Sequence, residues 1–303
     1  MALKLKDYEY LFDTDETRKK RELGDTRPGM IRWQRTRTTR AGDYIYVDSY
    51  PIWDNASTTK AKRQATEAHK EAQRKINNRR RSEHLEKILH TNFREDDFVI
   101  TLTYPAGQDP KSDEELEKDV NNFLRRVATR RKKKDMAETG NKYIWVGEKI
   151  NRKYGLTYHA HMVINSGGLS RHEIEEIWRK KHGGITNCDG LQIAGEGLTG
   201  LSKYLVKASG IMSTDQDKVG SRWYHRSMNL KEPTITVADK KISRRKAQEI
   251  KSDVSGNGKE IFEKLYKGYQ FLECRAYESE FINGVYIRAK LRRIEQPKGK
   301  TRQ

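Results

Sequence analysis

The clearest alternation of apolar and polar positions lies in the middle of the chain. Residues 98–104 form a short run of β-branched, aromatic and leucine side chains, bounded by aspartates and a proline, which predicts a β-strand. Residues 142–148 and 156–164 predict two further strands. Because only the polar stretch 151–155 separates them, we expect these two strands to pair as an antiparallel hairpin.

Two amphipathic helices are predicted in the same region, each with a recognisable start signal. Ser112 and Glu115 have the spacing of a capping box, and apolar residues follow at helical spacing through residues 116–127. The first turn of this helix is acidic and its end is basic, as the helix dipole favours. Ser170 and Glu173 form a second capping box and predict the start of the second helix.

A short strand at residues 191–194 and a helix at residues 198–208 complete this region. The order of elements is therefore strand, helix, hairpin, helix, strand, helix. This order predicts an α+β fold, with a central antiparallel β-sheet and helices packed on one of its faces.

The two ends of the chain predict a helical N-terminal extension and an α/β C-terminal extension. A strand-like stretch at residues 43–48 precedes a long basic helix at residues 60–90. Helices are expected at about residues 240–253 and 258–267, followed by two strands that flank the turn dipeptide Asn283–Gly284. We therefore expect a basic N-terminal region, a central domain and a C-terminal accessory region, comprising residues 1–92, 93–210 and 211–303.

The charge of the chain indicates a polyanionic partner. Lys and Arg number 62 against 43 Asp and Glu, which gives a net charge of +19. Contacts to phosphates would supply most of the binding energy, so we expect nucleic acid. A membrane surface fits less well, because the basic residues are not gathered on one amphipathic helix. The run Arg79, Arg80 and Arg81 is either a solvated helical face or a contact surface for the DNA backbone.

The cysteines and the N-terminus indicate a reducing compartment. Cys188 and Cys274 are too few for a disulfide framework. The N-terminal residues have no apolar signal core, and no stretch is long enough to cross a bilayer. We therefore expect a soluble, cytoplasmic protein with no membrane partner.

The candidate chemistry centres on the predicted hairpin. His159 and His161 are two residues apart in a strand, so their side chains share one face while Ala160 points to the other. If Glu148 lies opposite His159, a carboxylate joins the two imidazoles on that face. Two histidines and one carboxylate with open positions suit a catalytic metal. Alternatively, the histidine pair arises by chance and Glu148 is an ordinary charge at a strand end.

A candidate nucleophile lies on the last helix of the central region. Tyr204 and Lys207 are three residues apart and share one helical surface. A tyrosine hydroxyl has a pKa near 10 and is a poor nucleophile unless a nearby cation favours the phenolate. The alternative interpretation is a half-buried packing tyrosine beside a surface lysine.

These three pieces together resemble the superfamily named for its His-hydrophobic-His (HUH) motif, which includes rolling-circle replication initiators, conjugative relaxases and related transposases. Residues 98–104 look like its first strand, residues 159–161 like its histidine motif, and residues 204–207 like its Tyr-x-x-Lys helix. The resemblance implies Mg²⁺ or Mn²⁺ bound by His159, His161 and Glu148. It also implies attack by Tyr204 on DNA, which leaves a 5′-phosphotyrosine and a free 3′-OH.

Over about residues 75–245 the chain resembles the initiators of Gram-positive plasmids, phages and conjugative elements. The partners implied are single-stranded or hairpin origin DNA and the helicase and polymerase of a bacterial host cell. No phosphate-binding loop is present, so no nucleotide is expected. Other candidate DNA contacts are Lys203, Trp145 and Tyr158, although packing in the sheet explains the two aromatic residues equally well.

The chain departs from the family pattern at two positions. Some phage initiators carry a second tyrosine, and here its place holds Gly200, which indicates a single-tyrosine enzyme. The middle residue of the histidine motif is the small Ala160. Three alternatives stay open: a relaxase, a transposase, and a nucleic-acid-binding protein without catalytic activity. Tyr204 follows the histidine motif, which favours an initiator over a relaxase.

Overall fold

The structure is a computed structural model of the 303-residue chain. It describes residues 31–53, 67–135, 140–152, 155–193, 195, 197–210, 223–253, 255–256, 258–278 and 284–294. The chain forms two compact units. We call residues 1–79 and 233–303 the terminal unit, and residues 80–232 the central unit.

This division differs from the three consecutive segments 1–92, 93–210 and 211–303 expected from the sequence. The expected first and third segments contribute strands to one sheet, and residues 223–232 belong to the central unit. The physical reason is pairing between strands that are more than 200 residues apart in the chain, such as Ile287 with Ser49. Local periodicity contains no information about such pairing.

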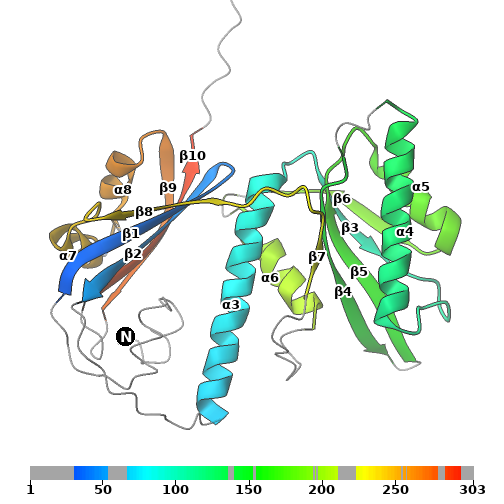
Figure 1. Cartoon of the computed structure of the whole chain (residues 1–303), viewed down its shortest axis with the longest axis horizontal. Coiled ribbons are helices and arrows are strands. Elements are labelled where there is room, and N and C mark those ends of the chain that lie inside the picture. The colour runs from blue at the N-terminus through cyan, green and yellow to red at the C-terminus, as the bar shows by residue number, and fades with distance from the viewer. Residues whose placement is uncertain are drawn as a thin grey trace, which may run out of the picture. The chain divides into compact units, whose positions relative to one another are not determined.

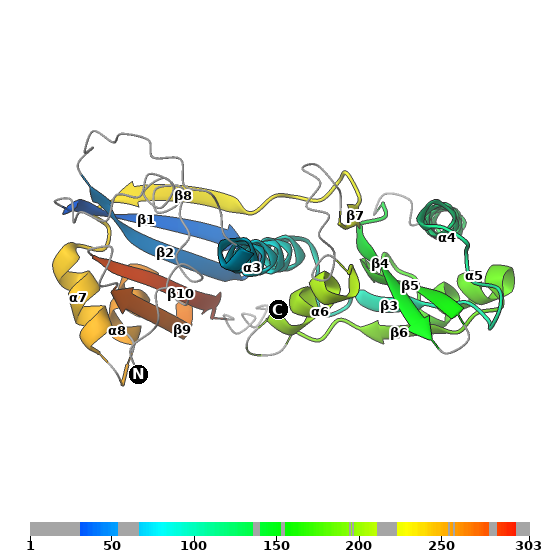
Figure 2. The same cartoon turned by 90° about the horizontal axis from the view of Figure 1, so that it is seen from below.

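The terminal unit is an antiparallel five-stranded sheet with helices over one face (Figures 1 and 2). The strand order is β8-β1-β2-β10-β9. The strands are β1 (Ile31–Ala41), β2 (Tyr44–Trp53), β8 (Thr234–Asp239), β9 (Tyr269–Glu278) and β10 (Val285–Arg293). The helices are α7 (Arg244–Ser252) and α8 (Lys259–Leu265).

Several expectations for this unit are confirmed. Both helices and the last two strands are present, and the stretch at residues 43–48 lies almost wholly in β2. Asn283 of the predicted turn is outside the described residues. Strands β1 and β8 were not expected. In β1 the buried side chains include Thr36 and Thr38, so its inward positions do not look apolar in the sequence.

The central unit contains the predicted antiparallel sheet, in the order β6-β3-β5-β4-β7 (Figure 1). Its strands are β3 (Phe98–Leu102), β4 (Tyr143–Arg152), β5 (Gly155–Ile164), β6 (Thr186–Gly190) and β7 (His225–Arg226). Its helices are α4 (Asp113–Lys132), α5 (Arg171–His182), α6 (Thr199–Ala208) and the part of α3 (Glu67–Asn92) from Arg80 onward.

The α+β class is confirmed, but the expectation that helices cover one face of this sheet is wrong. Helices α4 and α5 pack on one face, where Met162 and Ile164 are buried. Helices α3 and α6 pack on the other face, where Val146 and Val163 are buried. Both faces of β5 are therefore apolar near its end, which favours a sheet covered on both sides.

The local start signals are confirmed in detail at one helix and in half at the other. Ser170 and Glu173 form the complete capping box of α5. Ser112 accepts a hydrogen bond from the backbone N–H of Glu115 at the start of α4, but the Glu115 carboxylate accepts from the N–H of Lys111 instead of completing the box.

One strand was placed wrongly. The sequence predicted a strand at residues 191–194, whereas β6 ends at Gly190 and residue 194 is outside the described residues. Leu191 is apolar because it packs in the core from a loop, and β6 itself is polar because it is an edge strand. Among the helices that the structure describes, none is long and apolar enough to cross a membrane.

Candidate metal and nucleophile site

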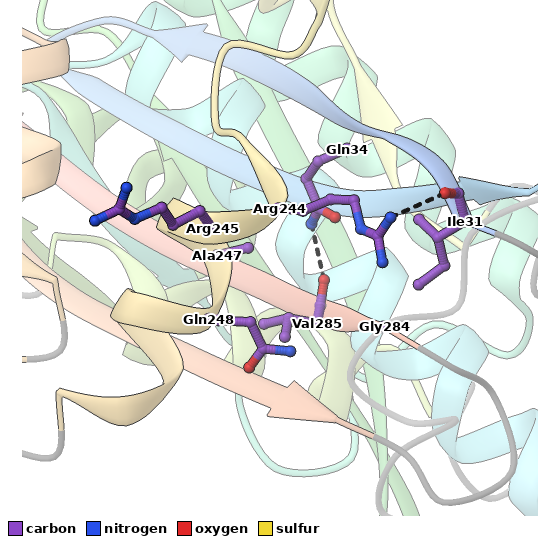
Figure 3. A pocket seen from close by; sticks show the side chains of 8 residues that line it. All are labelled: Ile31, Gln34, Arg244, Arg245, Ala247, Gln248, Gly284 and Val285. Atoms are coloured by element: carbon purple, nitrogen blue, oxygen red, sulfur yellow. Dashed lines mark hydrogen bonds between the residues drawn. The ribbon is translucent and has the colours of Figure 1, made fainter.

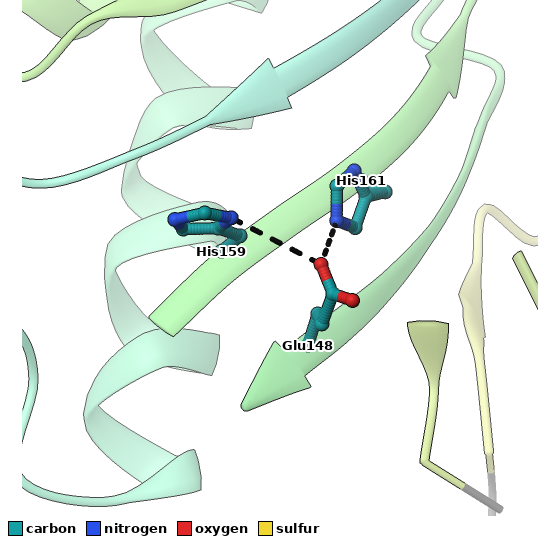
Figure 4. A group of neighbouring side chains, drawn as sticks. All are labelled: Glu148, His159 and His161. Atoms are coloured by element: carbon teal, nitrogen blue, oxygen red, sulfur yellow. Dashed lines mark hydrogen bonds and ion pairs between the residues drawn. The ribbon is translucent and has the colours of Figure 1, made fainter. Parts of the chain in front are cut away.

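The hairpin of β4 and β5 brings Glu148, His159 and His161 together. Glu148 lies opposite His159 and Val146 lies opposite His161, so the predicted register is confirmed. Val146 is buried against α3 and α6, which shows that these side chains occupy the face covered by those helices. Figure 4 shows the two imidazoles and the carboxylate pointing toward one another from the paired strands.

The three side chains form a compact set of metal-ligand types. Oε2 of Glu148 lies 2.7 Å from Nε2 of His161 and 3.9 Å from Nδ1 of His159. One ligand atom from each residue lies within 4.8 Å of the others. The His161 side chain is 4% exposed, whereas those of His159 and Glu148 are 18% and 28% exposed. Because the site is anchored by a buried imidazole and reachable on one side, it has the openness of a catalytic site.

Tyr204 of α6 lies against this set. Its hydroxyl oxygen is 3.1 Å from Nδ1 and 3.2 Å from Nε2 of His161, and the two rings meet edge to face. The residue is 45% exposed, so an incoming substrate can reach the phenol. The alternative of a half-buried packing tyrosine therefore accounts for part of the ring but not for the position of its hydroxyl.

The surroundings of Tyr204 keep the phenol protonated. Burial first, and then the negative charge of Glu148, raise the pKa of Tyr204 above its ordinary value. An attacking phenolate therefore needs positive charge beside Glu148, which is what a cation on the same carboxylate provides.

Thr101 is a neighbour that sequence reasoning missed. It lies opposite His161 in the β3–β5 ladder, and its Oγ1 is 3.1 Å from Nδ1 of His161. The signal was a hydroxyl residue inside the apolar strand at residues 98–104. Its meaning depends on the register between β3 and β5, and these strands are about 60 residues apart in the chain.

The other candidate residues do not join the cluster. Lys203 and Lys207 are exposed on α6, and within the described part of the chain no hydrogen bond or ion pair joins Lys207 to Tyr204. The remaining candidates on helix α3 are partly buried, namely Arg79, Arg80 and Arg81.

Trp145 and Tyr158 are buried in the core on the face of α4 and α5. The Trp145 ring is also stacked on His225, with centroids 4.0 Å apart. The packing interpretation of these two rings therefore agrees with the structure, and neither ring has a free face for a base.

A separate cavity lies in the terminal unit. It has a volume of about 350 Å³, and Arg244 and Arg245 at the start of α7 are among its lining residues (Figure 3). In its wall Gln34 donates a hydrogen bond to the carbonyl of Val285 at 2.8 Å. Its lining contains no histidine, cysteine or carboxylate, so it lacks the ligand types of a metal site.

Comparison with known protein families gave a match within the central unit. Residues 97–209 match the sequence model of a family of replication-associated proteins of the ORF2 type. The matched segment contains the three cluster residues, Thr101 and Tyr204. Neither the curated proteins nor the solved structures gave a significant match. The family match supports a replication initiator role.

Proposed function

We propose that this protein is a replication initiator that nicks and rejoins single-stranded origin DNA through Tyr204. The observation that carries the proposal is the position of the Tyr204 hydroxyl, 3.1 Å from a ring nitrogen of a histidine in a set of three metal-ligand types. The family match over residues 97–209 supports the biological role.

The donor set fits a divalent cation. His159 and His161 offer ring nitrogens and Glu148 offers a carboxylate oxygen, so Mn²⁺ or Mg²⁺ would be held by mixed nitrogen and oxygen ligands. When bound, such an ion acts as a Lewis acid that polarises the oxygens of the scissile phosphate.

The covalent step conserves bonds and protons. The Tyr204 oxygen forms a bond to phosphorus as the bond from phosphorus to the 3′ oxygen breaks. The proton that the phenol loses is matched by the one that the departing 3′ oxygen gains. The products are a 5′-phosphotyrosine and a 3′-OH that a host polymerase can extend. Because a phosphodiester replaces a phosphodiester, an attacking 3′-OH can reverse the step and rejoin the strand.

The substrate is single-stranded DNA or DNA extruded from a hairpin, because base pairing hides the target phosphate geometry. Lys207 and Lys203 are exposed beside Tyr204 on α6, where they can contact the DNA backbone and stabilise charge on the phosphate. The chain has no phosphate-binding loop, so a host helicase would separate the strands.

A relaxase or a transposase would use the same chemistry on different DNA. The discriminating observation is the DNA that is cut. An initiator cuts at one position in DNA that leads to replication of the element, whereas a transposase cuts at element ends. A non-catalytic nucleic-acid-binding protein would bind DNA equally well with Mn²⁺ or with EDTA.

The direct test uses labelled single-stranded oligonucleotides that tile both strands of the DNA next to the gene, incubated with the protein and Mn²⁺. We expect one oligonucleotide to form a protein adduct that survives denaturing electrophoresis. Tyr204→Phe should abolish the adduct and leave DNA binding within about twofold. The matched control is Tyr158→Phe, which removes a hydroxyl from a buried ring on the other face of the sheet. An adduct with Tyr204→Phe would show that the nucleophile is assigned wrongly.

A second test addresses the cation. Titration calorimetry with Mn²⁺ alone should give one site per chain. Glu148→Gln and His161→Ala should each lose that site and the adduct together. Retention of Mn²⁺ binding in both variants would place the cation elsewhere.

A further inference from the structure

Helix α6, which carries Tyr204, has no side-chain cap of its own. Its N-cap is Leu198, which makes no side-chain capping hydrogen bond, and its first turn has no acidic residue. The first N–H groups of a helix have no partners within the helix. They must be satisfied from outside, or α6 would begin with buried, unpaired donors.

Helix α3 supplies the missing partners. Nε2 of His90 accepts a hydrogen bond from the backbone N–H of Leu198 at 2.8 Å. Oε1 of Glu86 accepts one from the hydroxyl of Thr199 at 2.8 Å. Its negative charge near the start of α6 is also favoured by the helix dipole.

A third contact lies one turn farther back on α3. The hydroxyl oxygens of Ser82 and Ser202 are 3.1 Å apart. Ser82, Glu86 and His90 are spaced by four residues, so they form a row along one face of α3. All three are buried.

We propose that Ser82, Glu86 and His90 form a polar ladder that positions α6 so that Tyr204 reaches the metal cluster. The ladder acts through the helix and touches no reacting atom, so its members are positioning residues. The inference rests on the proposed nicking activity of Tyr204.

Directionality is the reason for assigning this role to the polar contacts. The apolar contacts around α6, made by residues such as Leu89, Leu205 and Val206, stabilise burial without fixing one register. A slip of α6 by one residue would move the phenol about 1.5 Å along the axis and turn it by roughly 100°. The Tyr204 hydroxyl could not then stay 3.1 Å from the His161 ring.

The ladder also specifies the state of His90. Because the N–H of Leu198 donates to Nε2, that nitrogen carries no proton and the ring proton sits on Nδ1. A residue that replaces His90 must therefore offer an acceptor. The metal ligands lie on β4 and β5 and do not depend on this contact.

The test compares three variants of the full chain. His90→Leu keeps an apolar volume and removes the acceptor. His90→Gln keeps an acceptor oxygen. His84→Leu is the matched control, because His84 is an exposed histidine on the same helix. Single-turnover adduct formation, the Kd for Mn²⁺ and amide hydrogen exchange are measured for each.

For His90→Leu we expect adduct formation to slow by roughly 10- to 100-fold, since a displacement of about 1 Å can cost that much. The Kd for Mn²⁺ should stay within about twofold, and amides of α6 should exchange about tenfold faster while those of β5 are unchanged. His90→Gln should recover most of the rate, and His84→Leu should behave as the wild type.

The inference is wrong if α6 amides of His90→Leu exchange as in the wild type, whether or not the protein cuts DNA. It is also wrong if the rate and Mn²⁺ affinity fall by the same factor, because that result indicates general damage to the fold. A wild-type protein that forms no adduct with any oligonucleotide contradicts the proposed function, and hydrogen exchange then still decides whether the ladder fixes α6.

Discussion

Replacing Thr101 with valine tests whether an outer hydrogen bond orients the buried ligand His161. Valine keeps the shape of threonine and removes the hydroxyl that lies 3.1 Å from Nδ1. The carboxylate of Glu148 faces Nε2, so a cation on that side requires the ring proton to sit on Nδ1. A hydroxyl can accept this proton in a hydrogen bond, and a methyl group cannot.

The size of the effect follows from the loss of one hydrogen bond between neutral groups. Such a bond contributes about 0.5–1.5 kcal/mol, and about 1.4 kcal/mol corresponds to a tenfold change in affinity. We therefore expect the Kd for Mn²⁺ to rise roughly two- to twelve-fold in Thr101→Val. Thr101→Ser should restore most of the affinity because it keeps the hydroxyl.

Titration calorimetry with Mn²⁺ measures this directly, and the nitrogen chemical shifts of His161 report which tautomer is present. The matched control is Thr103→Val, which removes a hydroxyl that donates to the carbonyl of Ile185 instead of facing the histidine. If Thr101→Val binds Mn²⁺ as tightly as the wild type and shows the same tautomer, the reasoning about His161 is refuted.

Three further predictions concern stability, each checked by denaturant unfolding. Gly200→Ala should stabilise the chain by about 0.5–1 kcal/mol, since a Cβ at Gly200 meets no atom within 4 Å and alanine favours the helix; a loss of stability would contradict this. Arg131→Met should destabilise it by about 3 kcal/mol or more, because the buried guanidinium bonds acceptors in residues 140–141 and 165–166; a change below about 1 kcal/mol would refute that role. A hydrogen bond from Lys134 lowers the pKa of Glu173 to about 2, so its stabilisation is present above the ordinary carboxyl pKa of 4.5 and is lost as pH falls toward 2. Glu173→Gln should therefore flatten the stability profile across that window, and an unchanged slope would contradict this.

The site was predictable to the extent that it depends on local pairing. The register of β4 and β5 follows from alternation and a short connection, and it places Glu148 beside His159 and His161. The position of α6 was not predictable in the same way. Its partners Glu86 and His90 lie more than 100 residues earlier in the chain, on a helix that the sequence presents only as a basic one.

The fold was predictable where apolar residues alternate and not where threonine and arginine replace them. The strand at residues 98–104 and the helices of the central region follow from periodicity. Strand β1 pairs with β2 and β8, but its buried positions are largely polar. The assignment of helices to one face failed for a related reason, since each face of β5 needs its own cover and the sequence does not show which helix provides it.

The small residue in the histidine motif has a structural explanation. Ala160 points away from the cluster into the core under α4, and its partner across the hairpin is Gly147. A Cβ on Gly147 would lie 2.9 Å from Cδ2 of Leu116 on α4. The two strands that carry the ligands thus pack closely against α4 on one face. The face that holds the imidazoles is therefore supported from behind by a dense core, and the nucleophile is held from the front by α3. Rigidity at both positions favours a reaction in which the phosphorus has to pass between a fixed cation site and a fixed phenol.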